Sequence, residues 1–167
     1  IVKAFAKLNI PLVVFGTGPE LNKLKNMAGK RTKFVGNVDD QEKTRLYRRA
    51  IGCINPQIED FGITAVEAMA AGRPVIAYGI GGAAETVLPG KTGKFIAMQT
   101  WEDIGDAVIR HKPQDYDPKQ IRAFAENFSY ENFEKKFLQA IASMLKLEDP
   151  IEEELTLIED AYAPYLN

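Results

Sequence analysis

The sequence has very little of the side-chain chemistry that metal enzymes and covalent enzymes use. Its 167 residues include one cysteine and one histidine, so the chain cannot form an internal disulfide or a zinc site of several such ligands. We interpret the neighbouring pair Asp39-Asp40 as helix capping, and we expect no bound metal ion. No apolar run approaches 18 residues, which predicts that no segment spans a membrane.

The single cysteine, Cys53, lies in an apolar run. We interpret it as a buried, unreactive thiol, because free cysteine behaves as a small apolar residue in such surroundings. One unpaired cysteine fits a compartment that is kept reducing, since disulfides persist mainly in oxidising ones. We therefore expect the protein in the cytoplasm.

Charge is distributed unevenly, although the net charge is only −2. Residues 1–50 carry 11 lysines and arginines against 4 acidic residues, whereas residues 51–167 carry 10 against 19. Lys43, Arg45 and Arg48 alternate with apolar positions, as on the solvent face of an amphipathic helix. We expect no nucleic-acid partner. The alternative that stays open is a longer enzyme that binds membranes peripherally, with this basic end in contact with anionic lipid.

Short apolar runs alternate with segments of helical periodicity along most of the chain. The runs predict strands at residues 12–15, 33–35, 51–55, 75–78 and 94–97. The periodic segments predict helices at residues 19–28, 40–50, 62–72, 82–87, 101–111, 118–127 and 130–147. This alternation predicts an α/β fold with an open, doubly wound parallel sheet, the Rossmann-like architecture.

Several residues mark the ends of these predicted helices. Pro19 is suited to the first position of a helix, where its missing N–H costs nothing. Asp39 or Asp40 is suited to an N-cap. Gly72, followed closely by Pro74, predicts the end of a helix.

The two ends of the chain differ from the regular alternation. Ile1, Phe5 and Leu8 have helical spacing, so the chain opens within a helix, although a parallel sheet would place a strand before it. We therefore expect that the first strand of the sheet is missing. We expect one N-terminally truncated domain over residues 1–147 and an acidic, helical tail over residues 148–167.

Two glutamates eight positions apart carry the most specific chemistry. Glu59 lies in a loop after an apolar strand, and Glu67 lies inside the helix that begins near Gly62. The free amides in the first turn of that helix make an anion site. A carboxylate cannot bind a phosphate, but it accepts two hydrogen bonds from a sugar diol. An anion site beside two carboxylates therefore predicts a nucleotide-sugar ligand.

The segment around these glutamates is long enough to show a family pattern. Residues 59–77 read EDFGITAVEAMAAGRPVIA, and GGAAETV at 81–87 and GKTG at 90–93 extend the pattern. This pattern resembles the donor-binding half of the retaining GT-B glycosyltransferases, of the group 1 or glycogen-synthase-like type. The resemblance covers roughly residues 10–145 and implies that the predicted sheet is one half of a GT-B fold.

The resemblance also implies a donor site at the ends of the strands. Glu59 would contact the donor sugar as the catalytic residue, and Glu67 would hold the ribose hydroxyls. The other donor-binding positions that it implies are Gly16, Gly18, Val38, Phe61, Gly62, Ile63, Thr64 and Glu85. The run GIGG at residues 79–82 is either a second phosphate cradle or an ordinary tight turn.

The reaction that the resemblance implies is transfer of a hexose, with mannose favoured, from a nucleoside diphosphate to an acceptor hydroxyl with retention. GDP-mannose is the favoured donor and a UDP-hexose the alternative, with no other cofactor. The family's arginine and lysine, which neutralise the leaving diphosphate, would precede Ile1. The acceptor would be bound by a missing N-terminal domain. We therefore expect the isolated chain to be inactive.

Two other functions stay open at the level of sequence. Gly16-Thr17-Gly18 resembles the start of a dinucleotide fingerprint, with Asp39 about 20 residues further on. Leu21 stands where the third glycine of that fingerprint belongs, which weakens the case for an NAD-type domain. The second alternative is a nucleotide-sugar-binding module without catalysis, although retention of both glutamates favours a working site.

Overall fold

The computed structural model describes residues 1–144, and the predicted tail at residues 148–167 lies outside the described residues. The chain divides into two compact units, Ile1–Ala125 and Glu126–Asn167. The predicted domain boundary after residue 147 also lies outside the described residues, so it stays a prediction.

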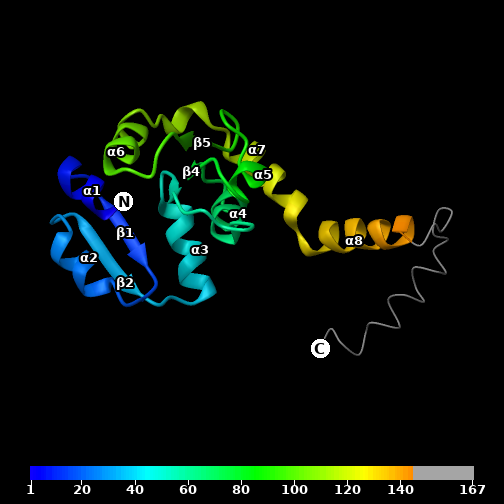
Figure 1. Ribbon diagram of the computed structural model, residues 1–167, viewed down its shortest axis with the longest axis horizontal. Helices are drawn as coiled ribbons and strands as arrows, with labels where there is room; N and C mark the ends of the chain where they lie inside the picture. Colours follow the sequence, from blue (N-terminus) through cyan, green and yellow to red (C-terminus); the bar gives the residue numbers. More distant parts are fainter. Residues whose placement is uncertain (145–167) are drawn as a thin grey trace. The chain divides into compact units, whose positions relative to one another are not determined.

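Helices and strands alternate through the first unit (Figure 1), and every strand pair is parallel. Its elements are α1 (Val2–Leu8), β1 (Leu12–Phe15), α2 (Leu21–Met27), β2 (Thr32–Gly36), α3 (Asp40–Arg49), β3 (Cys53–Asn55), α4 (Ile63–Ala70), β4 (Val75–Tyr78), α5 (Ala83–Thr86), β5 (Gly93–Ile96), α6 (Trp101–Ile109), the 3₁₀ helix η1 (Pro113–Asp115) and α7 (Pro118–Ala125). The predicted α/β class with parallel strands is confirmed.

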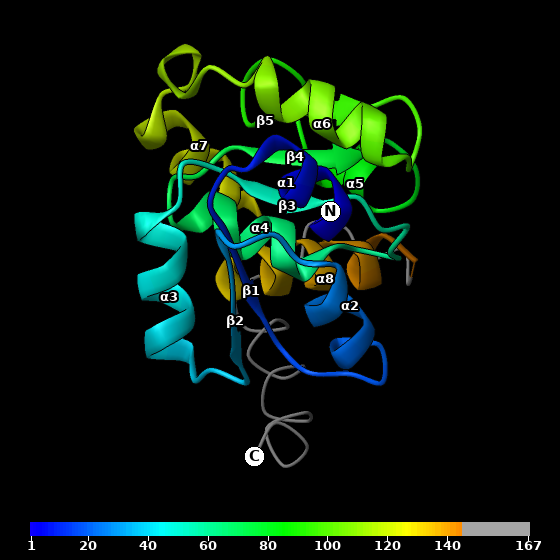
Figure 2. The same ribbon diagram turned by 90° about the vertical axis from the view of Figure 1, so that its left-hand side faces the viewer.

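The five strands found among residues 1–144 form two sheets, whereas the sequence predicts a single open sheet. One sheet pairs β1 with β2, and the other has the order β3-β4-β5. Figure 2 shows β1 and β2 running steeply across the direction of the other three strands. In the doubly wound order 3-2-1-4-5-6, the two sheets match the outer parts 3-2 and 4-5-6. The break falls where that order has its first strand.

Hydrophobic clusters lie on both faces of the three-stranded sheet. Val75 and Ala77 of β4 pack into one cluster with Met69 of α4. Ile76 packs into the other cluster, which Phe5 of α1 joins. Strand β4 is therefore covered on both sides, which explains its unbroken apolar run. Helices on both faces are the arrangement that the doubly wound prediction requires.

Two of the three predicted helix-end signals are observed, and the third is wrong. The Asp39 side chain accepts a hydrogen bond of 2.7 Å from the Glu42 amide and caps α3. Gly72, at φ +73°, follows the end of α4 as expected. Pro19 is not the first residue of α2, which begins at Leu21. A turn intervenes, in which the Leu21 amide donates to the Gly18 carbonyl at 3.1 Å.

The second unit begins with the 3₁₀ helix η2 (Glu126–Phe128) and continues with α8 (Tyr130–Met144). The Ser129 hydroxyl accepts a hydrogen bond of 3.3 Å from the Asn132 amide at the start of α8. Among residues 1–144, no helix has both the length and the apolar character needed to cross a bilayer.

Candidate functional site

The loop from β3 to α4 holds the first of the two predicted glutamates. Gly62 ends this loop in the left-handed region, at φ +87°, and α4 begins at Ile63. The Ala65 and Val66 amides donate to the Gly62 carbonyl at 2.9 and 3.3 Å. The amides of Ile63 and Thr64 come before this pair, so they have no acceptor within the helix. Free amides of this kind suit an anion, so the anion site that the sequence predicts here stays a prediction for these two amides.

Glu59 is fixed in this loop through both its backbone and its side chain. Its carbonyl accepts a hydrogen bond of 2.7 Å from the Gly82 amide. Its carboxylate Oε2 accepts a hydrogen bond of 3.2 Å from the Asn55 Nδ2. The same Oε2 lies 3.4 Å from the point where a Cβ would stand on Gly62. The Glu59 carboxylate is therefore held beside the start of α4.

Gly81 and Gly82, in the loop after β4, make this arrangement possible. A Cβ on Gly82 would lie 2.4 Å from the Phe61 Cα, and one on Gly81 would lie 2.6 Å from the Glu59 carbonyl oxygen. The two loops therefore pack backbone to backbone. This packing gives the run at residues 79–82 a structural role as a close-fitting turn. Glu85 follows as an exposed residue of α5.

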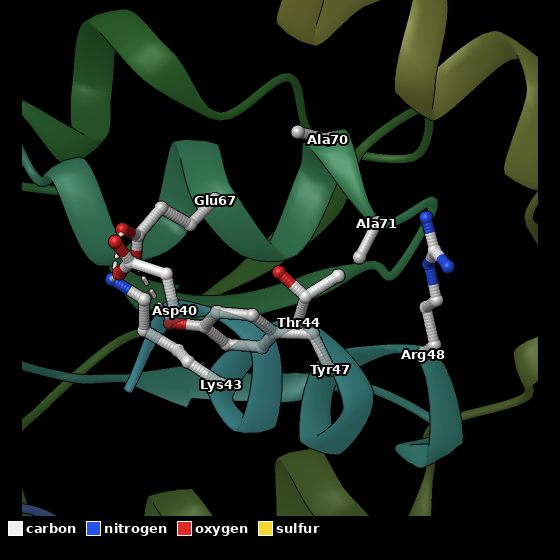
Figure 3. Close-up of a pocket in the computed structure, with 8 residues that line it drawn as sticks. All are labelled: Asp40, Lys43, Thr44, Tyr47, Arg48, Glu67, Ala70 and Ala71. Atoms are coloured by element: carbon white, nitrogen blue, oxygen red, sulfur yellow. Dashed lines mark hydrogen bonds and ion pairs between the residues drawn. The ribbon is translucent and has the colours of Figure 1, made fainter. Parts of the chain in front are cut away.

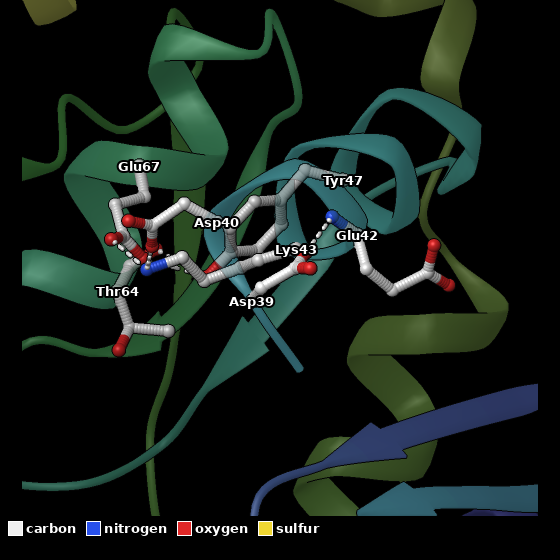
Figure 4. A network of polar contacts seen from close by, with 7 residues as sticks. All are labelled: Asp39, Asp40, Glu42, Lys43, Tyr47, Thr64 and Glu67. Carbon is white, nitrogen blue, oxygen red and sulfur yellow. Dashed lines mark hydrogen bonds and ion pairs between the residues drawn. The ribbon is translucent and has the colours of Figure 1, made fainter. Parts of the chain in front are cut away.

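Glu67, the second predicted glutamate, lies in α4 and joins it to α3 (Figure 4). Its Oε1 is 2.7 Å from the Lys43 Nζ, which is also 3.0 Å from an Asp40 carboxylate oxygen. Its Oε2 lies 3.2 Å from the Tyr47 hydroxyl. The hydrogen bonds with Glu67 and then Asp40 raise the pKa of Lys43. Burial, aided by the nearby charges, raises the pKa of Tyr47, so its hydroxyl stays a donor at neutral pH.

A pocket of about 380 Å³ lies between α3 and α4 (Figure 3). Figure 3 shows Glu67, Lys43 and Asp40 together at one end, with Arg48 at the other. Its lining residues are Asp40, Lys43, Thr44, Tyr47, Arg48, Glu67, Ala70 and Ala71. Two cations, two hydroxyls and two carboxylates thus surround a space that suits a polar ligand with both acceptors and hydroxyls.

The predicted residues of the first sheet lie in a separate pair of loops. The Gly16 amide, after β1, donates to the Gly36 carbonyl at the end of β2 at 2.7 Å. The Thr17 Oγ1 donates to the Asn37 Oδ1 at 3.2 Å. Val38 follows and leads into α3. Gly16, Gly18 and Val38 thus lie at the carboxyl ends of β1 and β2, where ligands of open parallel sheets bind.

Three polar residues of this region are not among the sequence predictions: Asn55, Lys43 and Tyr47. Asn55 carries a faint signal, because it is a polar residue at the end of an apolar strand. Lys43 and Tyr47 carry none, since they follow the pattern of an ordinary amphipathic helix. Cys53, at the start of β3, lies near enough to both glutamates to be affected by their charges. Burial raises the pKa of its thiol to about 12, and the Glu67 and Glu59 charges add to this effect.

No metal centre is found in the part of the chain that the structure describes, where no group of three or more histidine, cysteine or acidic side chains could hold an ion. The sequence does contain one Asp-x-Asp run, at Asp115-Tyr116-Asp117. The Asp117 carboxylate accepts a hydrogen bond of 2.8 Å from the Lys119 amide and is engaged at the start of α7.

The comparison with protein families decides between the functional alternatives at the family level. The family described as "Glycosyl transferases group 1" matches residues 1–128. The chain belongs to the group 1 glycosyltransferases. This membership confirms the resemblance drawn from residues 59–93, and it covers most of the chain rather than the glutamate segment alone.

Individual relatives agree with this membership. The chain is 36% identical over 103 residues to a glycogen synthase of Mycobacterium tuberculosis, covering 58% of this chain and 25% of the relative. It is 33% identical over 106 residues to a phosphatidyl-myo-inositol mannosyltransferase of Mycobacterium leprae, covering 60% and 28%. The chain therefore spans little more than a quarter of the length of these relatives.

A solved structure supports the fold. The Anabaena HepE protein, in complex with UDP and glucose, superposes with a TM-score of 0.70 at 21% identity, covering 85% of this chain and 44% of HepE. The likeness at this level of identity concerns the fold, and it agrees with a Rossmann-like half of a GT-B enzyme.

Proposed function

We propose that this chain is the donor-binding domain of a retaining glycosyltransferase, which moves a hexose from a nucleoside diphosphate to an acceptor hydroxyl. The observation that carries this proposal is the place of the Glu59 carboxylate, 3.4 Å from a Cβ position on Gly62 at the start of α4. The first-turn amides suit a diphosphate. The adjacent carboxylate suits the hydroxyls of the sugar attached to it.

Glu67 extends the proposed site to the nucleoside. A carboxylate offers about four lone-pair sites, and Lys43 and Tyr47 each engage one oxygen of Glu67. Room for two further donors remains, which is what a ribose diol supplies. The glycine loops after β1 and β2 would then receive the base through backbone atoms.

We favour GDP-mannose as the donor and a UDP-hexose as the alternative. The resemblance of residues 56–62 and 77–83 to mannosyltransferase-like members supports the first, as does the name of the Mycobacterium leprae relative. The UDP and glucose named with HepE support the second. The proposal needs no metal, and it places the acceptor on another domain of a longer cytoplasmic enzyme.

Calorimetry with GDP, GDP-mannose, UDP, UDP-glucose and NAD tests the proposal. We expect either GDP and GDP-mannose or UDP and UDP-glucose to bind, with a binding free energy of about −4 to −8 kcal/mol, which is the micromolar to millimolar range. NAD should not compete. Absence of binding by every nucleotide at millimolar concentration would reject the site, and tight NAD binding would favour the dinucleotide alternative.

Substitution of each glutamate separates the two roles. Glu67→Ala should weaken nucleoside diphosphate binding by about 1–3 kcal/mol, because it removes a charged acceptor from the ribose hydroxyls. Glu59→Ala should leave the free diphosphate unchanged and weaken only the nucleotide-sugar. If both variants lose affinity equally for both ligands, this division of roles is wrong.

The activity of the chain distinguishes a partial site from a complete one. We expect no sugar transfer by residues 1–167, with or without Mg²⁺. Positioning of the acceptor can lower the reaction barrier by about 7–11 kcal/mol, and an acceptor that is not positioned lacks this reduction. A longer enzyme with an acceptor domain should transfer sugar, and EDTA should not abolish this activity. Transfer from radiolabelled donor by the 167-residue chain would show that it holds a complete active site.

A further inference from the structure

Asn55, which is not among the predicted site residues, makes the one side-chain hydrogen bond described for Glu59. It is the last residue of β3 and is only 2% exposed. Its Nδ2 lies 3.2 Å from the Glu59 Oε2. Because an ionised carboxylate only accepts hydrogen bonds, the amide nitrogen must face Glu59 in this contact. The orientation of the buried amide is therefore set by the glutamate.

The backbone on either side of this contact is held independently. Pro56 follows Asn55 directly, and its carbonyl accepts a hydrogen bond of 2.6 Å from the Gln99 Nε2. The Glu59 carbonyl accepts from the Gly82 amide at 2.7 Å. With its main chain fixed, Glu59 retains only its side-chain torsions as freedom. The Asn55 amide is the contact that selects one of the resulting carboxylate positions.

An asparagine at this place in the fold lowers the stability of the folded chain. The Asn55 Oδ1 is buried and has no hydrogen-bond partner among the described residues. A buried acceptor without a partner loses its hydration and gains nothing in return. An apolar side chain of the same shape would avoid this loss. Among the described residues, the hydrogen bond to Glu59 is the one side-chain contact of the amide that offsets this loss.

We infer that Asn55 is a positioning residue, which fixes the Glu59 carboxylate toward the sugar of the bound donor. This inference rests on the proposed function, in which Glu59 contacts that sugar. It predicts that Asn55 affects recognition of the sugar and leaves recognition of the nucleotide alone. The quantity to measure is the ratio of the affinities for the nucleotide-sugar and for the free nucleoside diphosphate.

The first test uses Asn55→Leu, which has the branched shape of asparagine without its polar atoms. Calorimetry with GDP-mannose and GDP, and with UDP-glucose and UDP, gives the affinity ratio. We expect Asn55→Leu to reduce the ratio by about 10-fold, to leave diphosphate affinity unchanged and to keep the melting temperature at or above that of the wild type. Asn22→Leu, at an exposed position of α2, is the matched control and should leave the ratio unchanged.

The second test uses Asn55→Asp, whose effect depends on pH. At pH 8, two carboxylates would stand within hydrogen-bond distance and repel each other, so the ratio should fall as in Asn55→Leu. As the pH is lowered to 5.5, the pair takes up a shared proton and regains a donor, so the ratio should recover several-fold. The wild-type ratio should stay nearly constant over this range, because an amide does not titrate.

The outcomes separate the inference from the proposed function. A wild-type chain that binds none of the four ligands would reject the proposed function. If the wild-type chain binds both the nucleotide-sugar and the diphosphate, two results would overturn the positioning role. One is a ratio in Asn55→Leu equal to that of the wild type, and the other is a ratio in Asn55→Asp that does not change with pH. If Asn55→Asp does not fold, the comparison of Asn55→Leu with Glu59→Gln decides. The side-chain carbonyl introduced by Glu59→Gln would still accept a hydrogen bond from the Asn55 amide, so the side chain at position 59 would keep its position.

Discussion

The backbone contact between the two site loops provides the sharpest test of the structure. Gly82 has φ −57° and ψ −24°, which is an ordinary helical conformation. Alanine accepts this conformation at no cost, and it is favoured over glycine by about 0.5–1 kcal/mol in helices. Any loss of stability in Gly82→Ala must therefore come from the space that the added methyl group occupies.

That space is already filled by the neighbouring loop. The new Cβ would stand 2.4 Å from the Cα and 2.5 Å from both the carbonyl carbon and the carbonyl oxygen of Phe61. These are backbone atoms, so no side chain can rotate away to relieve the contact. Overpacking of this kind costs about 1–3 kcal/mol. For a chain of this size, that cost lowers the melting temperature by about 2–4 °C per kcal/mol.

Gly105→Ala is the matched control, because Gly105 is a buried helical glycine of α6 whose added Cβ would meet only the Leu8 Cδ1, at 3.8 Å. This control should be as stable as the wild type or more so, by about 0.5–1 kcal/mol. Urea and thermal unfolding of the two variants give the comparison. If Gly82→Ala proves as stable as Gly105→Ala, the close approach of the two loops is wrong.

Three further predictions concern other contacts. Asp39→Ala should reduce the free energy of unfolding by about 0.5–2 kcal/mol, because it removes the cap of α3, while Asp40→Ala should cost far less in the same urea titration. Tyr47→Phe keeps the ring and removes the hydroxyl that donates to Glu67, so it should cost about 1 kcal/mol in urea unfolding. Burial lowers the pKa of His111 below its ordinary value, so the unfolded chain binds more protons as the pH falls below about 7. Stability should therefore decrease from pH 7.5 to pH 5.5, and His111→Asn should make this decrease smaller in urea titrations at the two pH values.

Local patterns in the sequence were enough for the elements and for the placement of the two glutamates. The strands β1 and β4 have the predicted bounds, because each is a short apolar run between turn residues. Asp39 caps α3 because a cap needs only an amide three residues further along the chain. Glu59 on a loop and Glu67 on a helix follow from the same local signals, and the family pattern in residues 59–93 gave their proposed roles.

Only the tertiary structure decided which side chains meet at the site. Lys43 and Glu67 are 24 residues apart and lie on different helices, so no local pattern pairs them. The division of the strands into two sheets, and the packing of Gly82 on Phe61, likewise depend on segments that meet only after folding. Asn55 shows the limit most clearly. The sequence places it at the end of a strand, whereas the burial of its amide and its hydrogen bond to Glu59 are visible only in the folded chain. Periodicity records the face that a residue presents, while a specific polar contact depends on how distant elements pack together.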